Sequence, residues 1–379
     1  MLRLKYLVPS TLLFVILSVG ENAQELFFDG MYAAPASHQT RPIEWDQSLQ
    51  QVPEWYSSTE AARIADNVLL YQRIAGGWPK NIDMAAVLSF SDKATVSKQK
   101  TEADATIDND ATYTQLTFLG RVYEAQRNEK YKAAFIEGFD YLISAQYENG
   151  GWPQYYPVKH GYYSHITYND NAMVGVMKLM REVADAKAPY QFLDQARREK
   201  AKRAVAKGVE CFLKTQVKVD GKLTVWCAQN DEKTLGPAPA RTFEPVSLSG
   251  MESVGIVRFL MAINNPDDRI IDAIEGAVSW FKKSRIDGFR WLQKTDASKM
   301  HGFDRVLIKD TSSGPLWARF YEIDTNRPIF MGRDSVVHYD VSEIEDERRN
   351  GYQWYVAEPD GLLKREYPAW KQRITKKTT

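Results

Sequence analysis

The sequence predicts an all-α-dominated protein of repeated helix pairs with a small irregular or β-rich C-terminal part. Three observations support this fold class: an aromatic turn recurs at a fixed interval, apolar residues at helical spacing flank each turn, and strand-like stretches follow roughly residue 300. Units of this kind bury their apolar stripes against one another. The pairs are therefore expected to pack side by side, either as an open solenoid or as a closed toroid.

The repeat is marked by tryptophan. GGWPKN (76–81) and GGWPQY (150–155) nearly match, and GKLTVW (221–226) is a weaker third copy. Trp78, Trp152 and Trp226 recur every 74 residues, and GFRW, ending at Trp291, is interpreted as a degenerate fourth copy. A length of 379 residues would suggest two domains, but repetition of this kind overrides that expectation.

Apolar residues three or four apart predict a helix before each turn and a second helix after the first three turns. Ser57-x-x-Glu60 has the pattern of a capping box for the first helix. The helices before the turns contain Ala62, Ala65 and Leu69; Phe135, Phe139 and Leu142; Ala201, Val205, Gly208 and Phe212; and Ile271, Ile274, Val278 and Phe281. Those after the turns contain Leu116, Leu119 and Tyr123; Met173, Met177, Met180 and Ala184; and Met251, Val254, Val257 and Met261.

The C-terminal part has a different pattern. LWARFYEI (316–323), PIFM (328–331) and SVVHYDV (335–341) are rich in β-branched and aromatic residues, which indicates strands. No linker rich in Pro, Gly or Ser precedes them. We therefore expect this part to pack on the helices as one domain with them.

The N-terminus has the layout of a secretory signal peptide. Arg3 and Lys5 precede an apolar run over residues 7–19, and small residues lead to Ala23. We expect residues 1–23 to be removed, residues 24–50 to form a lead segment and residues 51–379 to form a single domain of a secreted protein, extracellular or periplasmic. A retained anchor helix is the alternative. No later stretch has the length of a bilayer span, so no membrane partner is expected.

Composition excludes several function classes. Lys plus Arg equals Asp plus Glu at 49 each, so no net field attracts nucleic acid. No HExxH, CxxC, GxSxG or phosphate-binding glycine loop occurs, which argues against zinc, redox, serine-hydrolase and nucleotide chemistry. Export permits a bridge between Cys211 and Cys227, but two buried thiols are favoured. Nothing requires more than a monomer.

Two clusters of Asp and Asn precede predicted second helices. They occupy residues 106–112, with Asp108, Asn109 and Asp110, and residues 168–172, with Asp170 and Asn171. One such cluster is most simply a helix N-cap. Two at equivalent places in neighbouring repeats can converge, and their oxygens suit a hard cation, calcium more than magnesium.

Several stretches together resemble a known family. TIDNDATYTQLTFLGRVYEA (106–125), the two GGWP turns, HITYNDNAM (165–173), ARTFEPVSLSG (240–250), GPLWARFYEI (314–323) and TNRPIFMGRD (325–334) resemble the pectate lyases of polysaccharide lyase family ten. The resemblance spans roughly residues 50–360. It implies an α/α toroid, an incomplete α/α barrel, that cleaves de-esterified homogalacturonan by calcium-dependent β-elimination and releases unsaturated oligogalacturonides.

The same resemblance implies site residues. The calcium ligands would be Asp108, Asn109 and Asp170, and the base would be Arg241. The alternative for Arg241 is a structural ion pair with Glu244, which the residues by themselves favour.

Substrate contacts follow from the resemblance and from the aromatic turns. Arg327 would bind the polygalacturonate, with Arg319 and Lys80 as weaker candidates, because guanidinium groups match carboxylates. Trp78, Trp152 and Tyr156 are expected to stack on sugar rings, although at least one repeated Trp is expected to be a packing anchor. The third unit has no Asx cluster and offers Arg241, Glu244 and Ser249 instead.

Two other function classes remain open at this point. A glycoside hydrolase on a similar toroid would use two carboxylates, Asp108 or Asp110 with Asp170 or Glu244, and no metal. A noncatalytic saccharide-binding protein would keep the aromatic turns and tolerate loss of Arg241.

Overall fold

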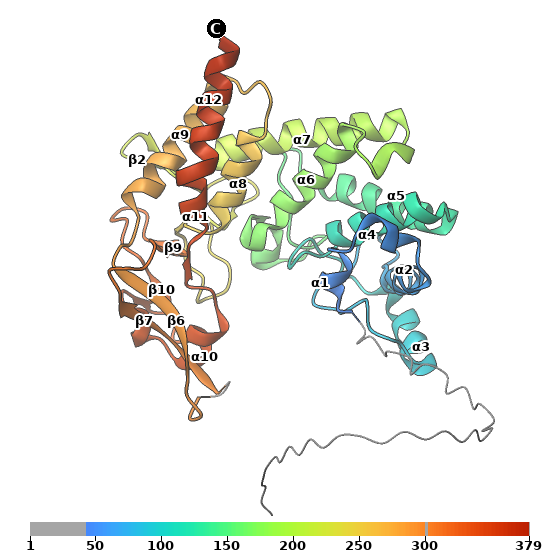
Figure 1. The fold of residues 1–379 in the computed structure, drawn as a ribbon, viewed down its shortest axis with the longest axis horizontal. Helices are drawn as coiled ribbons and strands as arrows, with labels where there is room; N and C mark the ends of the chain where they lie inside the picture. The colour runs from blue at the N-terminus through green and yellow to red at the C-terminus, as the bar shows by residue number, and fades with distance from the viewer. Residues whose placement is uncertain (1–42, 300–301, 379) are drawn as a thin grey trace, which may run out of the picture. The chain divides into compact units, whose positions relative to one another are not determined.

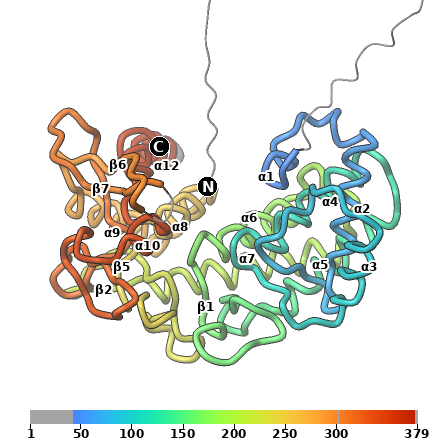
Figure 2. Tube along the Cα trace, turned by 90° about the horizontal axis from the view of Figure 1, so that it is seen from below, coloured from blue at the N-terminus to red at the C-terminus, as the bar shows by residue number. Residues whose placement is uncertain are grey.

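The helices form two layers, and within each layer successive helices follow a curve. The computed structural model describes residues 43–299 and 302–378. In the first layer, α2 (Thr59–Tyr71), α5 (Glu129–Ala145), α7 (Gln195–Thr215) and α9 (Asp268–Lys283) pack in that order (Figure 1). In the second layer, α4 (Tyr113–Gln126), α6 (Ala172–Ala184) and α8 (Glu252–Met261) pack on one another and on the helices that follow them (Figure 2). The predicted architecture of helix pairs is confirmed.

Most of the remaining elements are short, and the longest strands form one hairpin. Its strands, β6 (Phe289–Thr295) and β7 (Phe303–Lys309), are antiparallel. The other strands are two-residue pairs: β1 (Ile166–Thr167) with β4 (Gln229–Asn230), β2 (Lys218–Val219) with β3 (Lys222–Leu223), β5 (Leu248–Ser249) with β9 (Phe320–Tyr321), β8 (Trp317–Ala318) with β12 (Tyr355–Val356), and β10 (Phe330–Met331) with β11 (Val337–His338). The other helices are α1 (Trp45–Ser48), α3 (Phe90–Lys98), α10 (Asp346–Gly351), α11 (Glu358–Gly361) and α12 (Tyr367–Thr378).

All seven predicted helices are present, and one predicted boundary is wrong. The N-cap of α2 is Ser58, whose hydroxyl accepts a hydrogen bond from the Ala61 amide at 3.1 Å. Ser57 instead ends a 3-10 turn, and its hydroxyl donates to the Glu54 carbonyl at 2.7 Å. The Ser57–Glu60 capping box is therefore wrong by one residue, because the preceding turn takes up Ser57.

Four buried tryptophans have one structural role. Each indole N–H donates to a carbonyl near the end of the preceding first-layer helix: Trp78 to Val68 (2.7 Å), Trp152 to Leu142 (2.8 Å), Trp226 to Phe212 (2.7 Å) and Trp317 to Phe281 (2.8 Å). Each bond gives the buried indole N–H an acceptor and ties the turn to the end of the preceding helix. The fourth member is Trp317, and the assignment of Trp291 is wrong. Trp291 lies in β6, because the β6–β7 hairpin is inserted before the fourth turn.

A repeated glutamine joins neighbouring helix pairs. Each side-chain amide donates two bonds of 2.8–3.0 Å, one to its own turn and one to the next first-layer helix. These bonds fix the spacing between adjacent units. The donors and acceptors are Gln72 with Gly76 and Ala134, Gln146 with Gly150 and Ala204, and Gln216 with Thr224 and Ala273.

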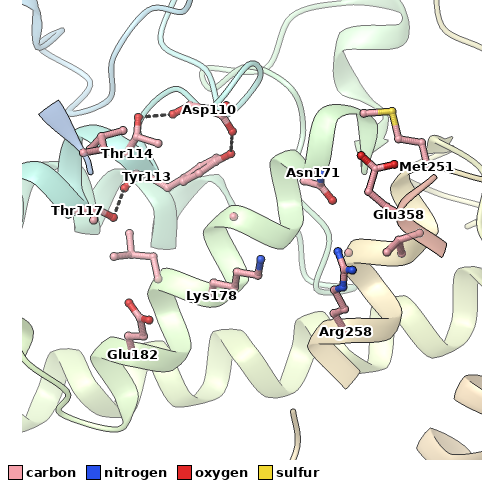
Figure 3. Close-up of a pocket in the computed structure, with 15 residues that line it drawn as sticks. Asp110, Tyr113, Thr114, Thr117, Asn171, Lys178, Glu182, Met251, Arg258 and Glu358 are labelled. Atoms are coloured by element: carbon pink, nitrogen blue, oxygen red, sulfur yellow. Dashed lines mark hydrogen bonds between the residues drawn. The ribbon is translucent and has the colours of Figure 1, made fainter. Parts of the chain in front are cut away.

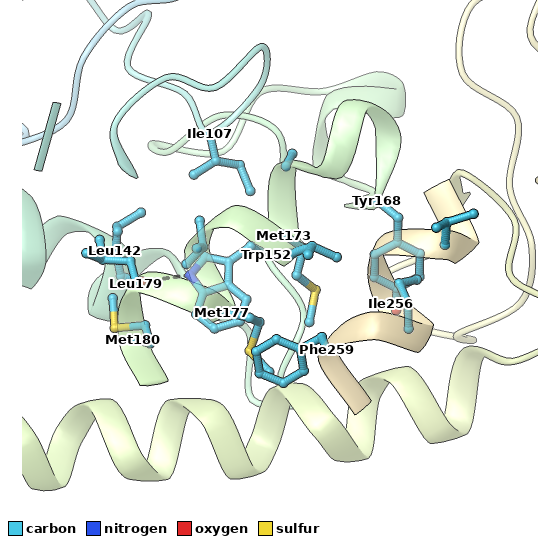
Figure 4. Close-up of a cluster of buried hydrophobic side chains, with 14 of the residues drawn as sticks. Ile107, Leu142, Trp152, Tyr168, Met173, Met177, Leu179, Met180, Ile256 and Phe259 are labelled. Atoms are coloured by element: carbon cyan, nitrogen blue, oxygen red, sulfur yellow. Dashed lines mark hydrogen bonds between the residues drawn. The ribbon is translucent and has the colours of Figure 1, made fainter. Parts of the chain in front are cut away.

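The core lies between the two layers. Met173 and Met177 of α6 pack with Trp152 and Phe259 in Figure 4. Helices α6 and α7 approach closely at Gly208, where an added Cβ would lie 2.2 Å from the Met177 sulfur. The methionines, which adapt their shape readily, fill the space around the large indole.

Replacing Trp152 by phenylalanine tests whether this residue is a packing anchor. The change leaves the buried Leu142 carbonyl without its donor, so the free energy of unfolding should fall by about 1–3 kcal/mol. Urea denaturation measures the loss. The KM for polygalacturonate, the substrate that the resemblance implies, should stay within twofold of the wild-type value. A large rise in KM without a loss of stability would instead support a substrate contact for Trp152.

The two cysteines are free and buried, as favoured from the sequence. Burial raises the pKa of Cys211 to about 11, which suits an inert thiol. Contacts group residues 42–379 into one unit, and the predicted signal peptide lies outside the described residues. None of the helices in residues 43–299 and 302–378 has the length and apolar character that crossing a bilayer requires.

Candidate functional site

The two Asx clusters form tight turns where α4 and α6 begin. Asn109, Asp110, Asp170 and Asn171 all have positive φ, at 48°, 62°, 49° and 60°. Asn and Asp tolerate this left-handed region better than other residues with a Cβ. Neither helix has a side chain that caps its N-terminus, so the interpretation of these clusters as N-caps is wrong.

Backbone strain is concentrated beside the first cluster. Thr112 has φ 68° and ψ −57°, an unfavourable conformation for a β-branched residue. Its hydroxyl accepts from the Trp78 amide at 3.1 Å and donates to the Thr106 carbonyl at 2.7 Å. These contacts hold the strained turn, and strain of this kind gathers at functional sites.

Asp108 is a buried carboxylate with one oxygen unpaired. Its Oδ2 accepts from the Lys80 ammonium and from Gln154 Nε2, the latter at 2.5 Å. Its Oδ1 has no hydrogen-bond partner among the described residues, although Asp108 is only 2% exposed. Burial acts to lower the pKa of Lys80, but Asp108 outweighs it and the net shift is upward. Lys80 is therefore held as a cation against this carboxylate.

Asp170 belongs to a second network of charges. Its Oδ1 accepts from Arg319 Nη2 at 2.9 Å, and its Oδ2 accepts from Asn169 Nδ2 at 2.6 Å. Arg319 also donates to Glu252, which is fully buried and accepts from the Ser249 hydroxyl. Burial acts to lower the pKa of Arg319, but Glu252, Tyr352 and Asp170 outweigh it, so the guanidinium stays charged.

Arg241 forms the ion pair with Glu244 that the residues by themselves favoured. Its Nε donates to Glu244 Oε2 at 2.8 Å, and its Nη2 donates to Oε1. This pair raises the pKa of Arg241. The Tyr352 hydroxyl donates to Glu244 Oε1 at 3.3 Å, and the Arg319 guanidinium lies 4.4 Å from the Tyr352 ring centre. Tyr352 thus connects the Arg241 pair to the Asp170 network.

Three arginines surround one aromatic ring. The guanidinium carbons of Arg241, Arg333 and Arg348 lie 4.9, 4.4 and 4.6 Å from the centre of the Phe243 ring. Arg348 is 4% exposed, and its Nη2 has no hydrogen-bond partner in the described part of the chain. Burial lowers the pKa of Arg348. We call Arg241, Arg333, Arg348 and Phe243 the arginine cluster. Glu244 pairs with Arg241 and Glu347 pairs with Arg333, so the positive charge that suits an anionic ligand is mainly that of Arg348.

Carboxylates of both Asx turns raise the pKa of the same tyrosine, Tyr113. Burial raises the pKa of Tyr113, and the charges of Asp110, Asp170 and Asp108 raise it further. The Tyr113 hydroxyl donates to Asp110. The nearby charge of Arg241 also affects the pKa of Lys80. Side chains from three repeats therefore lie close enough to influence one another.

A cavity of about 470 Å³ adjoins the Asx turns and is lined by residues of α4, α6 and α8. Figure 3 shows Asp110, Tyr113 and Asn171 together with Lys178 at this cavity. Glycine makes this arrangement possible, because a Cβ on Gly175 would lie 2.3 Å from Tyr113 Cζ. The second-layer helices therefore support the Asx turns as well as contributing to the core.

The predicted calcium ligands offer the hard oxygen donors that calcium prefers. The buried Oδ1 of Asp108, which has no hydrogen-bond partner among the described residues, is suited to bind a cation, and the Asp170 side chain is 37% exposed. Within residues 43–299 and 302–378, one group of three His, Cys, Asp or Glu side chains has ligand atoms within 4.8 Å, and it is His165, Asp231 and Glu232. The proposed ligands are not in that group, so the assignment of Asp108, Asn109 and Asp170 stays a prediction.

Some predicted substrate contacts are wrong. Trp78 and Trp152 are 0% exposed, so neither can stack on a sugar. The Arg319 side chain is 3% exposed and is paired with Asp170 and Glu252, so it positions Asp170 and cannot be a substrate contact.

Three predicted substrate contacts remain predictions. The Tyr156 ring is partly buried against Tyr141, with ring centres 5.7 Å apart. The Lys80 side chain is partly exposed. Exposed Arg327 stacks 3.6 Å over the Tyr339 ring at the turn between β9 and β10.

Sequence reasoning missed several residues of the site: Tyr113, Gln154, Phe243, Glu252, Arg333, Arg348 and Tyr352. Ser249-x-x-Glu252 has capping-box spacing before an apolar run, so Glu252 could have been found. Arg348 and Tyr352 carry no comparable local signal. They reach the site because distant parts of the chain meet there.

Comparisons with known proteins found a matching family and similar solved structures. The family described as pectic acid lyase matches residues 72–363. A family 10 polysaccharide lyase from Cellvibrio cellulosa is similar in structure, with a TM-score of 0.70 and 34% identity over 82% of this chain and 93% of that one. An aspartate-to-alanine mutant of that lyase in complex with trigalacturonic acid has a TM-score of 0.71 and 34% identity over 85% of this chain and 98% of that one. None of the curated proteins matches this chain.

Proposed function

The chain belongs to the pectic acid lyase family, and from that premise we propose that it cleaves de-esterified homogalacturonan by calcium-dependent β-elimination with Arg241 as the base. The enzyme is a pectate lyase, a polysaccharide lyase. The similar lyase was solved with trigalacturonic acid, which supports polygalacturonate as the polymer bound here. We further propose that the protein is secreted and acts as a monomer.

The observation that carries the proposal is the meeting of opposite charges from different repeats. Buried Asp108 and partly exposed Asp170 lie near Tyr113, while Arg241, Arg333 and Arg348 gather around Phe243. A polyuronate has negative charge on every sugar. The arginine cluster can attract the polyuronate electrostatically. Asp108 and Asp170 would repel it unless a cation lay between their carboxylates and those of the polymer.

Asp108, Asn109 and Asp170 would hold the calcium ion. When bound, calcium would supply positive charge to a uronate carboxylate and stabilise the charge that develops there in the transition state. Lys80 and Arg319, the present ion-pair partners of Asp108 and Asp170, orient these side chains.

Arg241 would remove the C5 proton of the uronate. The C–H electrons then form the C4–C5 double bond, the bond between C4 and the glycosidic oxygen breaks, and the departing oxygen takes a proton from water. Only a neutral guanidine can accept the proton, and the ordinary pKa of arginine lies above 12. Arg241 therefore needs alkaline conditions, and we expect the rate to rise toward alkaline pH.

The first test follows ultraviolet absorbance over time on polygalacturonate, with calcium and then with a chelator. Elimination leaves an unsaturated uronide that absorbs, so absorbance should rise with calcium and stop with the chelator. Release of reducing ends without absorbance would mean hydrolysis by a carboxylate pair. A saccharide-binding protein would give neither signal but would still retain the polymer.

Glu244, one of the carboxylates that a hydrolase mechanism would use, is poorly suited to act as a general acid. Burial acts to raise the pKa of Glu244, but its bonds to Arg241 outweigh burial and lower the pKa. A general acid needs a raised pKa to stay protonated near neutral pH. This favours elimination over hydrolysis at the Arg241 end of the site.

A further inference from the structure

The proposed base has an anionic partner that opposes its function. Arg241 and Glu244 are three residues apart in the loop between β4 and β5 and form a two-point pair. The Glu244 oxygens also accept from the Arg241 amide at 3.3 Å and from the Tyr352 hydroxyl at 3.3 Å. This carboxylate is therefore fixed in place, while the Arg241 side chain is 46% exposed and open to a ligand.

The other charges near Arg241 are of both signs. Its positive charge acts on three cations, Lys80, Arg333 and Arg348, of which Lys80 is paired with Asp108 and Arg333 with Glu347. Removing the Glu244 charge would take away the carboxylate that pairs directly with Arg241. The titratable and charged groups concerned are Glu244 in its own loop, Tyr162 in the 3-10 turn before β1, Arg348 and Glu347 in α10, Tyr352 after α10, Arg333 after β10, Lys80 after α2, and Asp108 before α4.

We propose that Glu244 is a positioning residue for Arg241: its two-point pair fixes the direction of the guanidinium, and its negative charge favours the protonated form of Arg241. The inference rests on the proposed function, because it assigns Glu244 a role only if Arg241 is the base. It explains why an exposed catalytic arginine is paired with a carboxylate in the resting protein.

The expected sign of the pH effect follows from the pair. Glu244 raises the pKa of Arg241, so less of the guanidine is neutral at a given pH. Loss of that charge should lower the pKa, and the alkaline rise of kcat should move to lower pH. Opposite charges at this range shift pKa values by about 1–3 units, so a displacement of about one pH unit or more is expected.

The test compares pH profiles of kcat for the wild type, Glu244→Gln and Glu244→Asp at saturating calcium. Glu244→Gln should move the rise to lower pH by about one unit and reduce the plateau, because the guanidinium is less well oriented. Glu244→Asp keeps the charge but shortens the side chain, so its plateau should fall while the rise stays at the wild-type pH. A profile of unchanged position in Glu244→Gln, or an equal displacement in both variants, would overturn the inference.

Glu60→Gln is a matched control. Arg63 and Glu60 form a two-point pair with the same spacing, at 2.8 and 2.6 Å, on α2. Both Gln variants should lose similar thermal stability, but only Glu244→Gln should displace the pH profile. A wild type without a calcium-dependent rise in absorbance would refute the proposed function. An inactive Arg241→Ala together with an undisplaced Glu244→Gln would refute only this inference.

Discussion

Replacing Arg241 by alanine is expected to lower kcat on polygalacturonate by about 10³-fold, because general bases contribute roughly 10²–10⁴-fold to rate. The side chain is partly exposed and its one carboxylate partner is Glu244, so the fold should be retained. Absorbance of the unsaturated product at saturating substrate measures the rate. Calcium affinity should change little, because Arg241 is not a proposed ligand.

The control for Arg241→Ala is Arg63→Ala, which removes an arginine from the other pair of the same spacing. Arg63 lies on α2 and contacts Glu60 and the carbonyls of Ala85 and Ala86. This variant should lose some stability and keep its kcat. If Arg241→Ala retained more than a tenth of the wild-type kcat, a carboxylate base would be the better assignment.

Asp108→Asn is expected to weaken calcium binding by about 100-fold, since loss even of groups that only support a ligand costs 10–100-fold. The buried Oδ1 of Asp108 has no other partner among the described residues, and the change also removes the charge that balances Lys80. Calorimetric titration of the chelator-treated protein with calcium measures the affinity. The kcat at low calcium should fall in parallel and recover in part at high calcium.

Asp104→Asn is the matched control in the same loop. Its carboxylate pairs with Arg73 at 2.5 Å and belongs to neither Asx cluster. Calcium affinity should therefore stay at the wild-type value, while stability falls slightly. Equal calcium titrations for wild type and Asp108→Asn would remove Asp108 from the ligand set.

The fold was largely predictable because helix periodicity is a local property. The apolar residues of α6, from Met173 to Ala184, recur every three or four positions, and any helix with that stripe must bury it. The spacing of Trp78, Trp152 and Trp226 defined the repeat without any structure. The prediction of the fourth tryptophan was wrong because the β6–β7 hairpin separates Trp317 from the preceding units, and the repeat does not predict the length of that hairpin.

The candidate site was only partly predictable. Both Asx clusters and the Arg241–Glu244 pair are local in sequence. The exposure of each side chain is not local, which is why Trp78 and Trp152 were expected to stack on sugars although packing between layers buries them. A recurring aromatic at a turn has the same sequence pattern whether its ring faces ligand or core.

By itself the sequence determined the helix pairs, their period, the family and the positions of the acidic turns, since these depend on residues close together in the chain. Only the tertiary structure decided which charges meet. Arg319 donates a hydrogen bond to Asn169, 150 positions earlier in the sequence, and Tyr352 donates one to Glu244, 108 positions earlier. Burial strengthens such pairs by lowering the local dielectric, and burial exists only after the layers have packed.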